Sequence, residues 1–586
     1  MCGIFGFVSK KKQPANLILD SLKQLEYRGY DSWGIVTASD STFLIDKHIG
    51  KIGNASTKLA ASVLGLGHTR WATHGGVTKA NAHPHLDCTK QITAVHNGII
   101  ENYLELKKNL TKNHKFISET DTEVSVHMIE ELCPKIGFEK AFIKTFKKFD
   151  GLNALIAIHC KQEELLVAKT GSPLIIGFGT GINYVASDPA SLLKHTKLVY
   201  FLEDGQMAKI TAEKVSIYDL KAEKEIVYKK QHISWSYEDT CKGTFDHFML
   251  KEIYDQPKVI DQILASNGSQ IKKLASLVKK SWGATMVACG SAAYAALCGT
   301  YLFSKIAKRH LNYSYGSEFG YILDFINPKS LIIPLSQSGE TIDIIDSVKK
   351  AKLKGATIAS MVNVLGSSLY RLSDFKILLN AGPEKAVAST KAFVAKLANL
   401  ILLSYELAGN YDKGRELLEM ASSETRRLLT KENILKLKNL AKVISSKKDI
   451  YSIGRGVSYP IALESCLKIK EVSYIHAEGF AAGELKHGFI ALVEKGVPCL
   501  VFAPNDETYN ETLSGAMEVK ARGGKIIGVS SKNHEIFDEY IEVNDCAEAT
   551  IIPNTVVAQV LAYFLAIEKG LDPDKPRNLA KSVTVK

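Results

Sequence analysis

The sequence lacks the patterns that mark several classes of protein. Its ten cysteines include no C-x-x-C pair and no dense framework, which argues against a zinc ribbon and a disulfide-rich secreted domain. No run of eighteen apolar residues occurs, and the first apolar run, from Ile4 to Val8, is too short for a signal sequence. No long basic block with interleaved aromatics accompanies the net charge of +12. We therefore expect a cytoplasmic protein that binds neither membrane nor nucleic acid, with a charge that favours small anionic substrates.

The 586 residues are too many for one ordinary core and predict several domains. Residues 1–220 combine short β-type runs with helical periods, which indicates an α+β layered domain. The polar stretch 221–245 is a predicted linker. Beyond it, a pattern of buried strand, Gly-rich turn and helix at 285–341 returns at 450–508. We expect two α/β parallel-sheet domains, 246–430 and 431–570, and a tail at 571–586.

A candidate phosphate loop lies at 336–341, after a buried strand and before a helix. It contains the hydroxyls of Ser336, Ser338 and Thr341 around Gly339. Hydroxyls, freed backbone N–H groups and the positive end of a helix dipole suit a phosphate monoester. A capped helix start is the alternative, since Ser and Thr are common caps. Three hydroxyls around a glycine favour phosphate, and the absence of Walker A or G-x-G-x-x-G spacing favours a phosphosugar over a nucleotide.

The second copy differs at the matching loop, where Asp506 and Glu507 would repel phosphate. Only the first copy is therefore expected to carry the ligand. Candidates for proton transfer follow the second Gly-rich turn, although each alone is more often a solvated surface group. They are Lys468, Lys470, Glu471, Glu478, Glu484, Lys486 and His487.

Both ends of the chain carry candidate nucleophiles. Removal of Met1 would make Cys2 the N-terminal residue, and its α-amine, with a pKa near ~8, could take the thiol proton. The alternative is a small apolar residue opening a strand. The tail from Pro576 to Lys586 is apolar enough to dock back, and Lys581 could then form an imine with a sugar carbonyl. A solvated lysine is the alternative there.

Four separated motifs occur in order near the N-terminus. They are Cys2-Gly3-Ile4-Phe5-Gly6, Tyr27 to Ser32, Gly67 to Gly75, and His96 to Asn102. This part resembles the class II (N-terminal-nucleophile, Ntn) glutamine amidotransferases, and the rest resembles tandem sugar-isomerase (SIS) domains. Nearly the whole chain is similar to the glutamine:fructose-6-phosphate aminotransferase (isomerizing) family, also called glucosamine-6-phosphate synthases. The resemblance implies an Ntn layered α+β domain followed by two α/β parallel-sheet SIS domains.

The resemblance also assigns residues of a glutaminase site. It implies that Cys2 attacks the glutamine side-chain amide, while Asn97 and the backbone N–H of Gly98 form an oxyanion hole. Glutamine itself would be held by Arg70, Thr73, His74 and Asp121, with Arg70 on the α-carboxylate and Asp121 on the α-ammonium. Trp71 would gate an ammonia channel and Tyr30 would sense glutamine. Their alternative is an ordinary aromatic packing role.

For the sugar site, the resemblance implies phosphate contacts from the 336–341 loop and its surroundings. The implied residues are Ser291, Ser336, Gln337, Ser338, Thr341, Val387 and Ser389. Lys581 would be the Schiff-base lysine and Glu471 the base that moves a proton between C1 and C2. His487 would open the sugar ring, supplied by a partner subunit, which implies a homodimer.

Three positions depart from the family pattern. Ala292 replaces a hydroxyl residue after Cys289-Gly290-Ser291, Phe489 replaces the usual proline after Lys486-His487-Gly488, and Trp33 replaces a small residue. Ala292 bears on sugar-phosphate affinity and Trp33 on the glutamine lid. None removes an implied catalytic group.

The expected reaction makes glucosamine 6-phosphate and glutamate from fructose 6-phosphate and glutamine. Imine chemistry needs no metal or organic cofactor, and no ligand cluster is visible in the sequence, so none is expected. Three rivals remain: an amidophosphoribosyltransferase, which needs a phosphoribosyl-diphosphate loop that we do not find; a deglycase or isomerase without glutaminase; and a phosphosugar-binding regulator without turnover. The intact N-terminal motifs oppose the second, and the presence of both Cys2 and Lys581 opposes the third.

Overall fold

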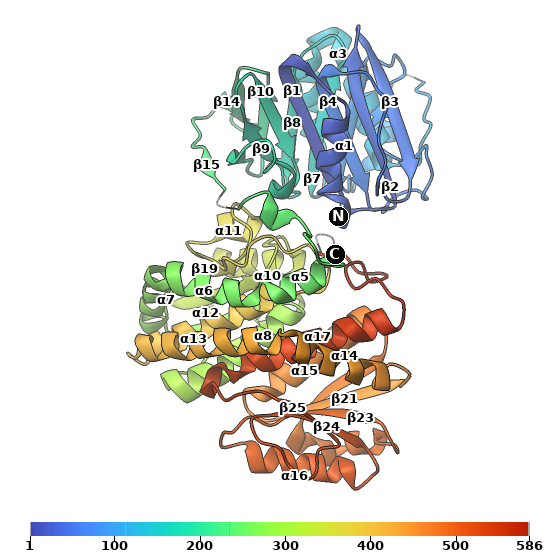
Figure 1. Cartoon of the computed structure of the whole chain (residues 1–586). Helices are drawn as coiled ribbons and strands as arrows, with labels where there is room; N and C mark the ends of the chain where they lie inside the picture. The colour runs from blue at the N-terminus through green and yellow to red at the C-terminus, as the bar shows by residue number, and fades with distance from the viewer. Residues whose placement is uncertain (1, 112, 234, 584–586) are drawn as a thin grey trace. The chain divides into compact units, whose positions relative to one another are not determined.

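The computed structural model describes residues 2–111, 113–233 and 235–583 (Figure 1). It contains two compact units: the first consists mainly of the residues up to Cys241, and the second runs from Lys242 to Lys581. The division therefore lies inside the predicted linker 221–245, and part of that segment forms strands of the first unit. Met1 and residues 584–586 of the predicted tail lie outside the described residues.

The first unit is built on two antiparallel sheets and a few helices. One sheet has the order β15-β11-β9-β10-β1-β4-β2-β3 and the other β14-β13-β12-β8-β7-β6-β5. The strands of the first are β1 (Gly3–Gln13), β2 (Ser32–Ser39), β3 (Thr42–Ile49), β4 (Ser62–Arg70), β9 (Ile175–Phe178), β10 (Ile182–Ala186), β11 (Leu198–Phe201) and β15 (Gln231–His232). Those of the second are β5 (His85–Leu86), β6 (Ile92–Gly98), β7 (Asn153–His159), β8 (Leu165–Thr170), β12 (Gln206–Ile210), β13 (Val215–Asp219) and β14 (Lys224–Glu225). The main helices are α1 (Asn16–Lys23), α2 (Tyr103–Lys108), α3 (Asp121–Ile136) and α4 (Phe138–Phe146).

The two sheets pack face to face between helical layers. Alternate residues of a strand point to opposite faces of its sheet. In β7, Ile156 and Ile158 enter the core between the sheets, whereas Leu155 and Ala157 pack against α3 and α4. Helix α1 packs on β1 and β4, the outer face of the other sheet. These alternating buried faces explain why the strands read as nearly continuous apolar runs.

The second unit contains two parallel sheets of five strands with the same topology. The orders are β17-β16-β18-β19-β20 and β22-β21-β23-β24-β25. In each sheet, the strand that comes second in the chain lies at the edge, next to the strand that comes first. The first sheet comprises β16 (Gly283–Ala288), β17 (Asn312–Tyr315), β18 (Ser330–Ser336), β19 (Thr357–Val362) and β20 (Phe375–Leu378). The second comprises β21 (Asp449–Gly454), β22 (His476–Ala481), β23 (Pro498–Phe502), β24 (Lys525–Ser530) and β25 (Glu539–Glu542).

Helices of the second unit share one apolar core with both sheets. That core takes Met286 and Ile333 from the first sheet and Ile450 and Leu500 from the second. The helices are α5 (Phe248–Tyr254), α6 (Gln256–Ser266), α7 (Gly268–Lys280), α8 (Ser291–Leu302), α9 (Gly316–Phe319), α10 (Ile342–Leu353), α11 (Ser368–Leu372), α12 (Lys391–Leu407), α13 (Tyr411–Leu428), α14 (Lys431–Ile444), α15 (Ser458–Ser473), α16 (Tyr509–Lys520) and α17 (Ile551–Glu568). In Figure 1, α17 runs beside α14 and α15. Contacts of α15 with α8 and of α17 with α12 and α13 join the two halves of the unit.

One helical stretch of the described chain, Ala547–Glu568, is long and apolar enough to cross a membrane by length and composition. Its most apolar window is 94% buried inside the fold. A core helix of a folded domain has the same properties, and the contacts of α17 with α13, α14 and α15 explain its composition in that way.

The predicted fold class, an α+β layered domain followed by two α/β parallel-sheet domains, is confirmed. The sequence repeat between 285–341 and 450–508 corresponds to the repeated strand order of the two sheets. In parallel α/β sheets, ligands bind beyond the carboxyl ends of the strands. The loops after β16, β18, β21 and β23 are therefore where a site of the second unit is expected.

Candidate functional site

Cys2 stands at the start of β1, where strand pairing brings it to the end of β4. Gly3 lies opposite Thr69 in the register of these strands. The N–H of Trp71, just past β4, donates to Cys2 Sγ at 3.3 Å. Burial raises the pKa of the Cys2 thiol, so the thiol is neutral near pH 7 and needs a base to become a nucleophile. The α-amine predicted for that task depends on Met1, which lies outside the described residues.

Asn97 and Gly98 reach Cys2 from the other sheet, at the end of β6. The Asn97 side-chain amide donates to the Cys2 carbonyl oxygen at 3.0 Å. Gly98 has φ +127°, and a Cβ there would lie 2.0 Å from the Leu152 carbonyl oxygen, so only glycine fits. The structure thus brings together the three residues predicted for amide attack and oxyanion binding.

His68, which the sequence reasoning missed, orients Asn97. Its Nε2 lies 3.1 Å from Asn97 Oδ1 and 3.0 Å from the His96 carbonyl oxygen. Burial lowers the pKa of His68 to about 3, so the ring stays neutral. The two acceptors indicate that Nε2 carries the proton. A signal was present in the Gly67-His68-Thr69-Arg70 motif, where His68 precedes a predicted ligand by two residues.

The predicted glutamine-binding residues surround the loop after β4. Arg70 donates to three backbone carbonyls of that loop, those of His74, Gly75 and Gly76. Burial lowers the pKa of Arg70, while the nearby carboxylates of Asp31 and Asp121 oppose that change. In the structure, Arg70 therefore holds the loop in place.

Asp121, Thr73 and His74 complete that predicted set. Asp121 opens α3, is buried, and accepts the N–H of Ile100 at 2.8 Å. The His74 ring meets the Tyr103 ring edge to face at 5.4 Å, whereas Thr73 is exposed. The predicted Asp121 carboxylate is thus fixed by a backbone contact near the end of β6.

The predicted gate residues are in contact. The Tyr30 and Trp71 rings pack edge to face with centroids 5.4 Å apart, and both side chains are half-buried. Trp33, the unusual residue of the lid motif, is buried and stacks on His48 at 4.4 Å. Its ring therefore has a packing role in β2.

In the second unit, the predicted phosphate loop joins β18 to α10. Ser336 Oγ accepts the N–H of Gly339 at 3.0 Å and lies 3.3 Å from Thr341 Oγ1. Ser338 Oγ accepts the N–H of Glu340 at 3.1 Å. Gly339 has φ +67°, and a Cβ there would lie 2.0 Å from Ser367 Oγ. The loop is therefore a tight, uncharged turn at a helix N-terminus, apart from Glu340, whose carboxylate accepts the N–H of Ser368 at 2.9 Å.

Other predicted phosphate ligands lie on neighbouring loops. Ser291 begins α8 directly after β16, and the Gln337 carbonyl accepts the N–H of Asn363 at 3.2 Å. The N–H of Val387 donates to the Asp574 carbonyl at 3.0 Å. Ser389 Oγ lies 3.4 Å from Glu384 Oε2. The 384–390 loop is thus bonded to the C-terminal tail.

Lys581 docks into that loop. Its Nζ lies 2.6 Å from Glu384 Oε2, with side-chain exposures of 6% for the lysine and 0% for the glutamate. Upstream, Arg577 donates its N–H to the Tyr474 hydroxyl at 2.7 Å, and its guanidinium stacks on that ring. The tail therefore returns to the fold and buries the predicted Schiff-base lysine.

Glu384 and Lys396 are parts of this site that the sequence reasoning did not assign. Glu384 accepts the N–H groups of Thr390 at 2.9 Å and Ala392 at 3.0 Å. Although burial opposes it, Lys581 holds the pKa of Glu384 at about 2. Burial lowers the pKa of Lys396 to about 8. Two lysines, Lys391 and Lys396, in the otherwise apolar run that became α12 were the available signal.

Glu471, the predicted base, lies on α15 and pairs with a buried lysine. Lys468 Nζ is 2.5 Å from Glu471 Oε2 and 3.5 Å from Glu464 Oε1. Burial opposes the charge of Lys468, but the two carboxylates raise its pKa overall. Burial raises the pKa of Glu464 to about 7. Lys468 and Glu471 therefore form a fixed ionic pair, and Glu464 is a further buried acid that was not predicted.

His487 stands apart from these groups. It ends the short 3-10 helix Ala482–His487 and is exposed. Across the described residues, no hydrogen bond or ion pair joins it to Lys581 or Glu471. Phe489, the departure two residues later, stacks on Phe480 at 4.5 Å.

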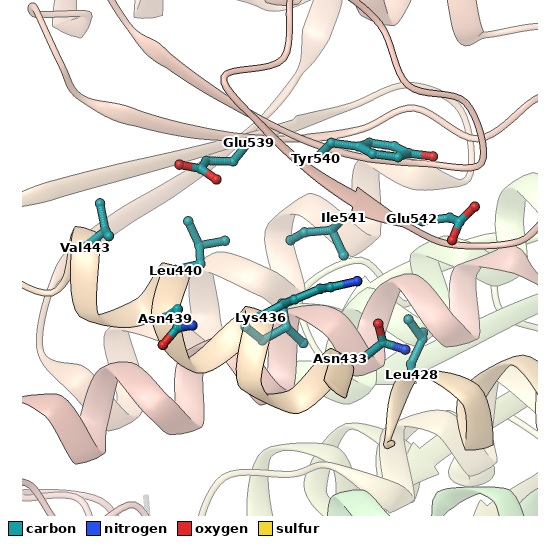
Figure 2. A pocket seen from close by; sticks show the side chains of 11 residues that line it. Leu428, Asn433, Lys436, Asn439, Leu440, Val443, Glu539, Tyr540, Ile541 and Glu542 are labelled. Atoms are coloured by element: carbon teal, nitrogen blue, oxygen red, sulfur yellow. The ribbon is translucent and has the colours of Figure 1, made fainter. Parts of the chain in front are cut away.

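A pocket of about 490 Å³ lies elsewhere in the second unit, between α14 and β25. Figure 2 shows Asn433, Lys436 and Leu440 of α14 on one side and Ile541 and Glu542 of β25 on the other. None of the predicted site residues lines it. This pocket is therefore separate from the loop cluster that holds Lys581.

Comparisons with known proteins match both units. A glutamine amidotransferase domain model matches residues 52–231. A SIS domain model matches twice, at residues 277–404 and 443–569. The two SIS matches cover the two parallel sheets.

Full-length relatives are similar to the chain from end to end. The glutamine–fructose-6-phosphate aminotransferase (isomerizing) of Thermococcus kodakarensis is 42% identical over 603 residues, with 100% of each chain covered. The protein of the same name from Aquifex aeolicus is 42% identical over 599 residues, again with 100% of each covered.

Among solved structures, the C-terminal domain of glucosamine-fructose-6-phosphate aminotransferase from Francisella tularensis is 33% identical with a TM-score of 0.54. The match covers 57% of this chain and 100% of that one. Sequence and structure comparisons thus point to the same group of proteins.

Proposed function

Because this chain belongs to the glutamine–fructose-6-phosphate aminotransferase (isomerizing) family, we propose that it converts fructose 6-phosphate and glutamine to glucosamine 6-phosphate and glutamate. This reaction is the first committed step of amino-sugar synthesis. The observation that carries the proposal is the buried ion pair between Lys581 and Glu384, which places an amine among the sugar-isomerase loops. The Cys2 site supplies the complementary half, release of ammonia.

In the first half-reaction, Cys2 Sγ attacks the side-chain amide carbon of glutamine and its proton passes to the α-amine of Cys2. Asn97 Nδ2 and the Gly98 N–H bind the developing oxyanion, a contribution of several kcal/mol in related sites, about 3 kcal/mol per donor. The ammonium returns its proton to the leaving ammonia. Water then hydrolyses the thioester and glutamate leaves. Arg70 and Asp121 hold the two charged groups of the glutamine backbone.

In the second half-reaction, the uncharged Lys581 amine attacks the C2 carbonyl of open-chain fructose 6-phosphate. Loss of water leaves an imine, which ammonia attacks to displace the lysine. Before attack, the Lys581 ammonium that pairs with Glu384 passes one proton to water. The phosphate is held by the Ser336, Ser338 and Thr341 loop at the start of α10.

Proton transfer completes the isomerisation. Glu471 moves a proton between C1 and C2, with Lys468 holding its carboxylate in position. His487 opens the sugar ring. Because His487 is exposed and makes no contact with Lys581 in its own chain, we propose a homodimer in which each subunit supplies this residue to the other.

The remaining features of the proposal concern delivery of ammonia and location in the cell. Trp71 and Tyr30 are proposed to separate the Cys2 site from water, so that ammonia reaches Lys581 before it is protonated. The enzyme is proposed to be cytoplasmic and to bind neither nucleic acid nor membrane.

The test is to incubate the full chain with glutamine and fructose 6-phosphate and to measure glutamate and glucosamine 6-phosphate. Cys2→Ala should abolish glutamate formation and leave sugar binding intact. Lys581→Ala should abolish amino-sugar formation and retain basal glutaminase activity. Lys569→Ala is a matched control, because Lys569 is exposed and lies upstream of the same tail.

Two results would contradict the proposal. If the wild-type enzyme formed glutamate but no amino sugar, fructose 6-phosphate would be excluded as the acceptor of ammonia. Amino-sugar formation by Lys581→Ala at the rate of Lys569→Ala would exclude the imine lysine. Circular dichroism of each variant shows whether a loss of activity comes from the missing side chain or from unfolding.

A further inference from the structure

A second cluster of ionisable side chains lies in the first unit, away from Cys2. Cys88 follows β5, His114 lies in the segment between α2 and α3, and His127 and Glu130 lie on α3. The side chains of His114, His127 and Glu130 are 2%, 1% and 11% exposed, while Cys88 is open to solvent. The proposed reaction uses none of the four.

The potential ligand atoms of this cluster face one another. Cys88 Sγ lies 3.6 Å from His114 Nδ1 and 3.8 Å from His127 Nδ1. Glu130 Oε2 lies 3.0 Å from each of the same two nitrogens. All four atoms lie within 4.8 Å of one another.

These separations match a tetrahedral metal site. Zinc binds sulfur at about 2.3 Å and nitrogen or oxygen at about 2.0–2.2 Å. Tetrahedral angles then place neighbouring ligand atoms roughly 3.3–3.6 Å apart. The four separations given above differ from those values by at most a few tenths of an ångström, and all four atoms lie within 4.8 Å of one another, so the side chains already surround a position where a metal ion could bind.

The outward nitrogens of both histidines face carboxylates. His114 Nε2 lies 3.2 Å from Glu131 Oε1, and His127 Nε2 lies 3.7 Å from Glu123 Oε1. Glu123 is itself fixed by the N–H groups of Ile117 at 2.8 Å and Ser118 at 2.7 Å. Carboxylates behind metal-bound histidines set the ring orientation and leave the other nitrogen free to bind metal. These two carboxylates, Glu131 and Glu123, are an observation separate from the four potential ligand atoms, and they also indicate a metal site.

We propose that Cys88, His114, His127 and Glu130 form a structural site for one Zn²⁺ ion. A set of one thiolate, two imidazoles and one carboxylate closes a tetrahedral zinc shell without a water position, as structural sites do. Binding releases the Cys88 thiol proton to solvent. The exposed Cys88 provides the entry path.

The site would fix the first turns of α3. Its ligands join three separate segments: the turn after β5, the described residues 113–120 and α3 itself. Asp121, proposed to bind glutamine, begins the same helix two turns before His127. Zinc would therefore stabilise the segment that carries Asp121 without taking part in the reaction.

The test uses the full-length chain, stripped with a chelator and dialysed, with Zn²⁺ alone as the probe. Competition with a chromophoric chelator gives the affinity, and metal analysis gives the stoichiometry. Wild-type protein should bind one zinc per chain, and Co²⁺ should give tetrahedral d–d bands with a thiolate charge-transfer band. Cys88→Ser should lose that band and bind zinc at least about 10-fold more weakly.

Cys133→Ser is the matched control, because Cys133 also lies on α3 and is half-buried but is not a member of the cluster. It should keep the wild-type affinity and spectrum. At one fixed zinc concentration, the melting temperature of wild type and Cys133→Ser should rise more than that of Cys88→Ser.

Equal zinc affinity in wild type and Cys88→Ser would overturn the proposal, as would a Co²⁺ spectrum without thiolate charge transfer. Either result would leave a carboxylate bridging two histidines by hydrogen bonds. None of these readouts uses glutaminase or amino-sugar formation, so failure of the metal site is distinct from failure of the proposed function.

Discussion

The two SIS copies share one strand order but differ at the loop that opens the helix after their third strand in sequence. In the first copy, the loop after β18 places Ser336 and Ser338 hydroxyls on backbone N–H groups. In the second, the loop after β23 uses a carboxylate, since Asp506 Oδ1 accepts the N–H and the hydroxyl of Thr508 at 2.8 and 2.7 Å. The second copy therefore carries its own anion at the position where the first has only hydroxyls, and where we propose that the sugar phosphate binds.

This difference explains how a repeated fold supports one site. A helix N-terminus favours a negative charge, whether from a ligand or from a side chain. Glu507, beside Asp506, pairs with Lys305 at 3.0 Å, so a lysine of the first copy balances its charge and Asp506 is the anion of the loop. In the proposed mechanism, the second copy and the tail after it instead contribute Glu471, Lys468 and Lys581. That mechanism divides binding and chemistry between the two copies.

The largest effect should come from giving the first loop the charge of the second. Ser338→Asp places a carboxylate beside the proposed phosphate site, and two charges about 5 Å apart at an effective dielectric of 20 repel by roughly 3 kcal/mol. We expect the KM for fructose 6-phosphate to rise at least about 100-fold, with glutaminase activity unchanged.

Ser338→Ala is the control for that change, because it removes the hydroxyl without adding charge. Its KM should rise only about 10-fold, the value of one hydrogen bond. Steady-state kinetics at varied fructose 6-phosphate distinguishes the two. A Ser338→Asp enzyme with unchanged KM would show that the first loop does not bind phosphate.

The next effect concerns the ion pair that links the first copy to the tail. Glu384→Gln removes the carboxylate that holds Lys581, and an unpaired buried lysine is costly, so the tail should leave its site. We expect kcat for amino-sugar formation to fall about 100-fold, roughly 2.7 kcal/mol, with little change in the KM for fructose 6-phosphate.

Glu384→Asp should recover part of that loss, since it restores the charge at a shorter reach. Glu416→Gln is a suitable control, because Glu416 pairs with Lys413 on the surface of α13. Equal kcat in Glu384→Gln and Glu416→Gln would show that the ion pair between Glu384 and Lys581 is not needed for catalysis.

Glu464 gives a smaller, pH-dependent contrast with Glu384. Glu384 pairs with Lys581 at 2.6 Å and accepts two backbone N–H groups, whereas the buried Glu464 carboxyl has Lys468 Nζ at the longer distance of 3.5 Å. Burial raises the pKa of Glu464 from 4.5 to about 7, so the folded state holds a proton that the unfolded state loses between those values. Its contribution to stability is full below pH 4.5 and is lost as the pH rises to 7.

Glu464→Gln removes this loss, because the amide stays neutral at every pH. We expect the variant to be more stable than wild type by about 2 kcal/mol at pH 8 and by much less at pH 5. Urea unfolding followed at both pH values measures the difference. A stability gain that is the same at pH 5 and pH 8 would contradict the raised pKa.

Much of this comparison could be predicted from sequence. Strand and turn patterns at 285–341 and 450–508 predicted the repeat, and Asp506 and Glu507 predicted the unequal loops, because these signals are local. The predicted α+β and α/β fold classes, the family and the reaction are confirmed by the structure and the relatives. The roles of individual site residues remain predictions.

Long-range partners could not be predicted in the same way. Glu384 and Lys581 are far apart in the chain and meet only because the tail folds back. The sequence around one of them therefore does not identify the other as its partner. Cys88, His114 and α3 likewise come from three segments with no regular metal-ligand spacing. Buried charge in an apolar helix, as at Lys396, was the one local sign that a partner had to exist.

The smallest effect should come from the reverse change in the second copy. Asp506→Ser replaces the internal anion by a hydroxyl like those of the first loop, and loss of a helix-capping carboxylate costs about 1 kcal/mol. Fructose 6-phosphate binding and both activities should not change, because the second copy holds no ligand in the proposed mechanism. Chemical denaturation measures the stability loss, and isothermal titration with fructose 6-phosphate counts bound ligand. A second equivalent of sugar phosphate bound by Asp506→Ser would mean that Asp506 alone keeps the second loop closed to ligand, so the two copies would differ by one charge rather than by the architecture of their sites.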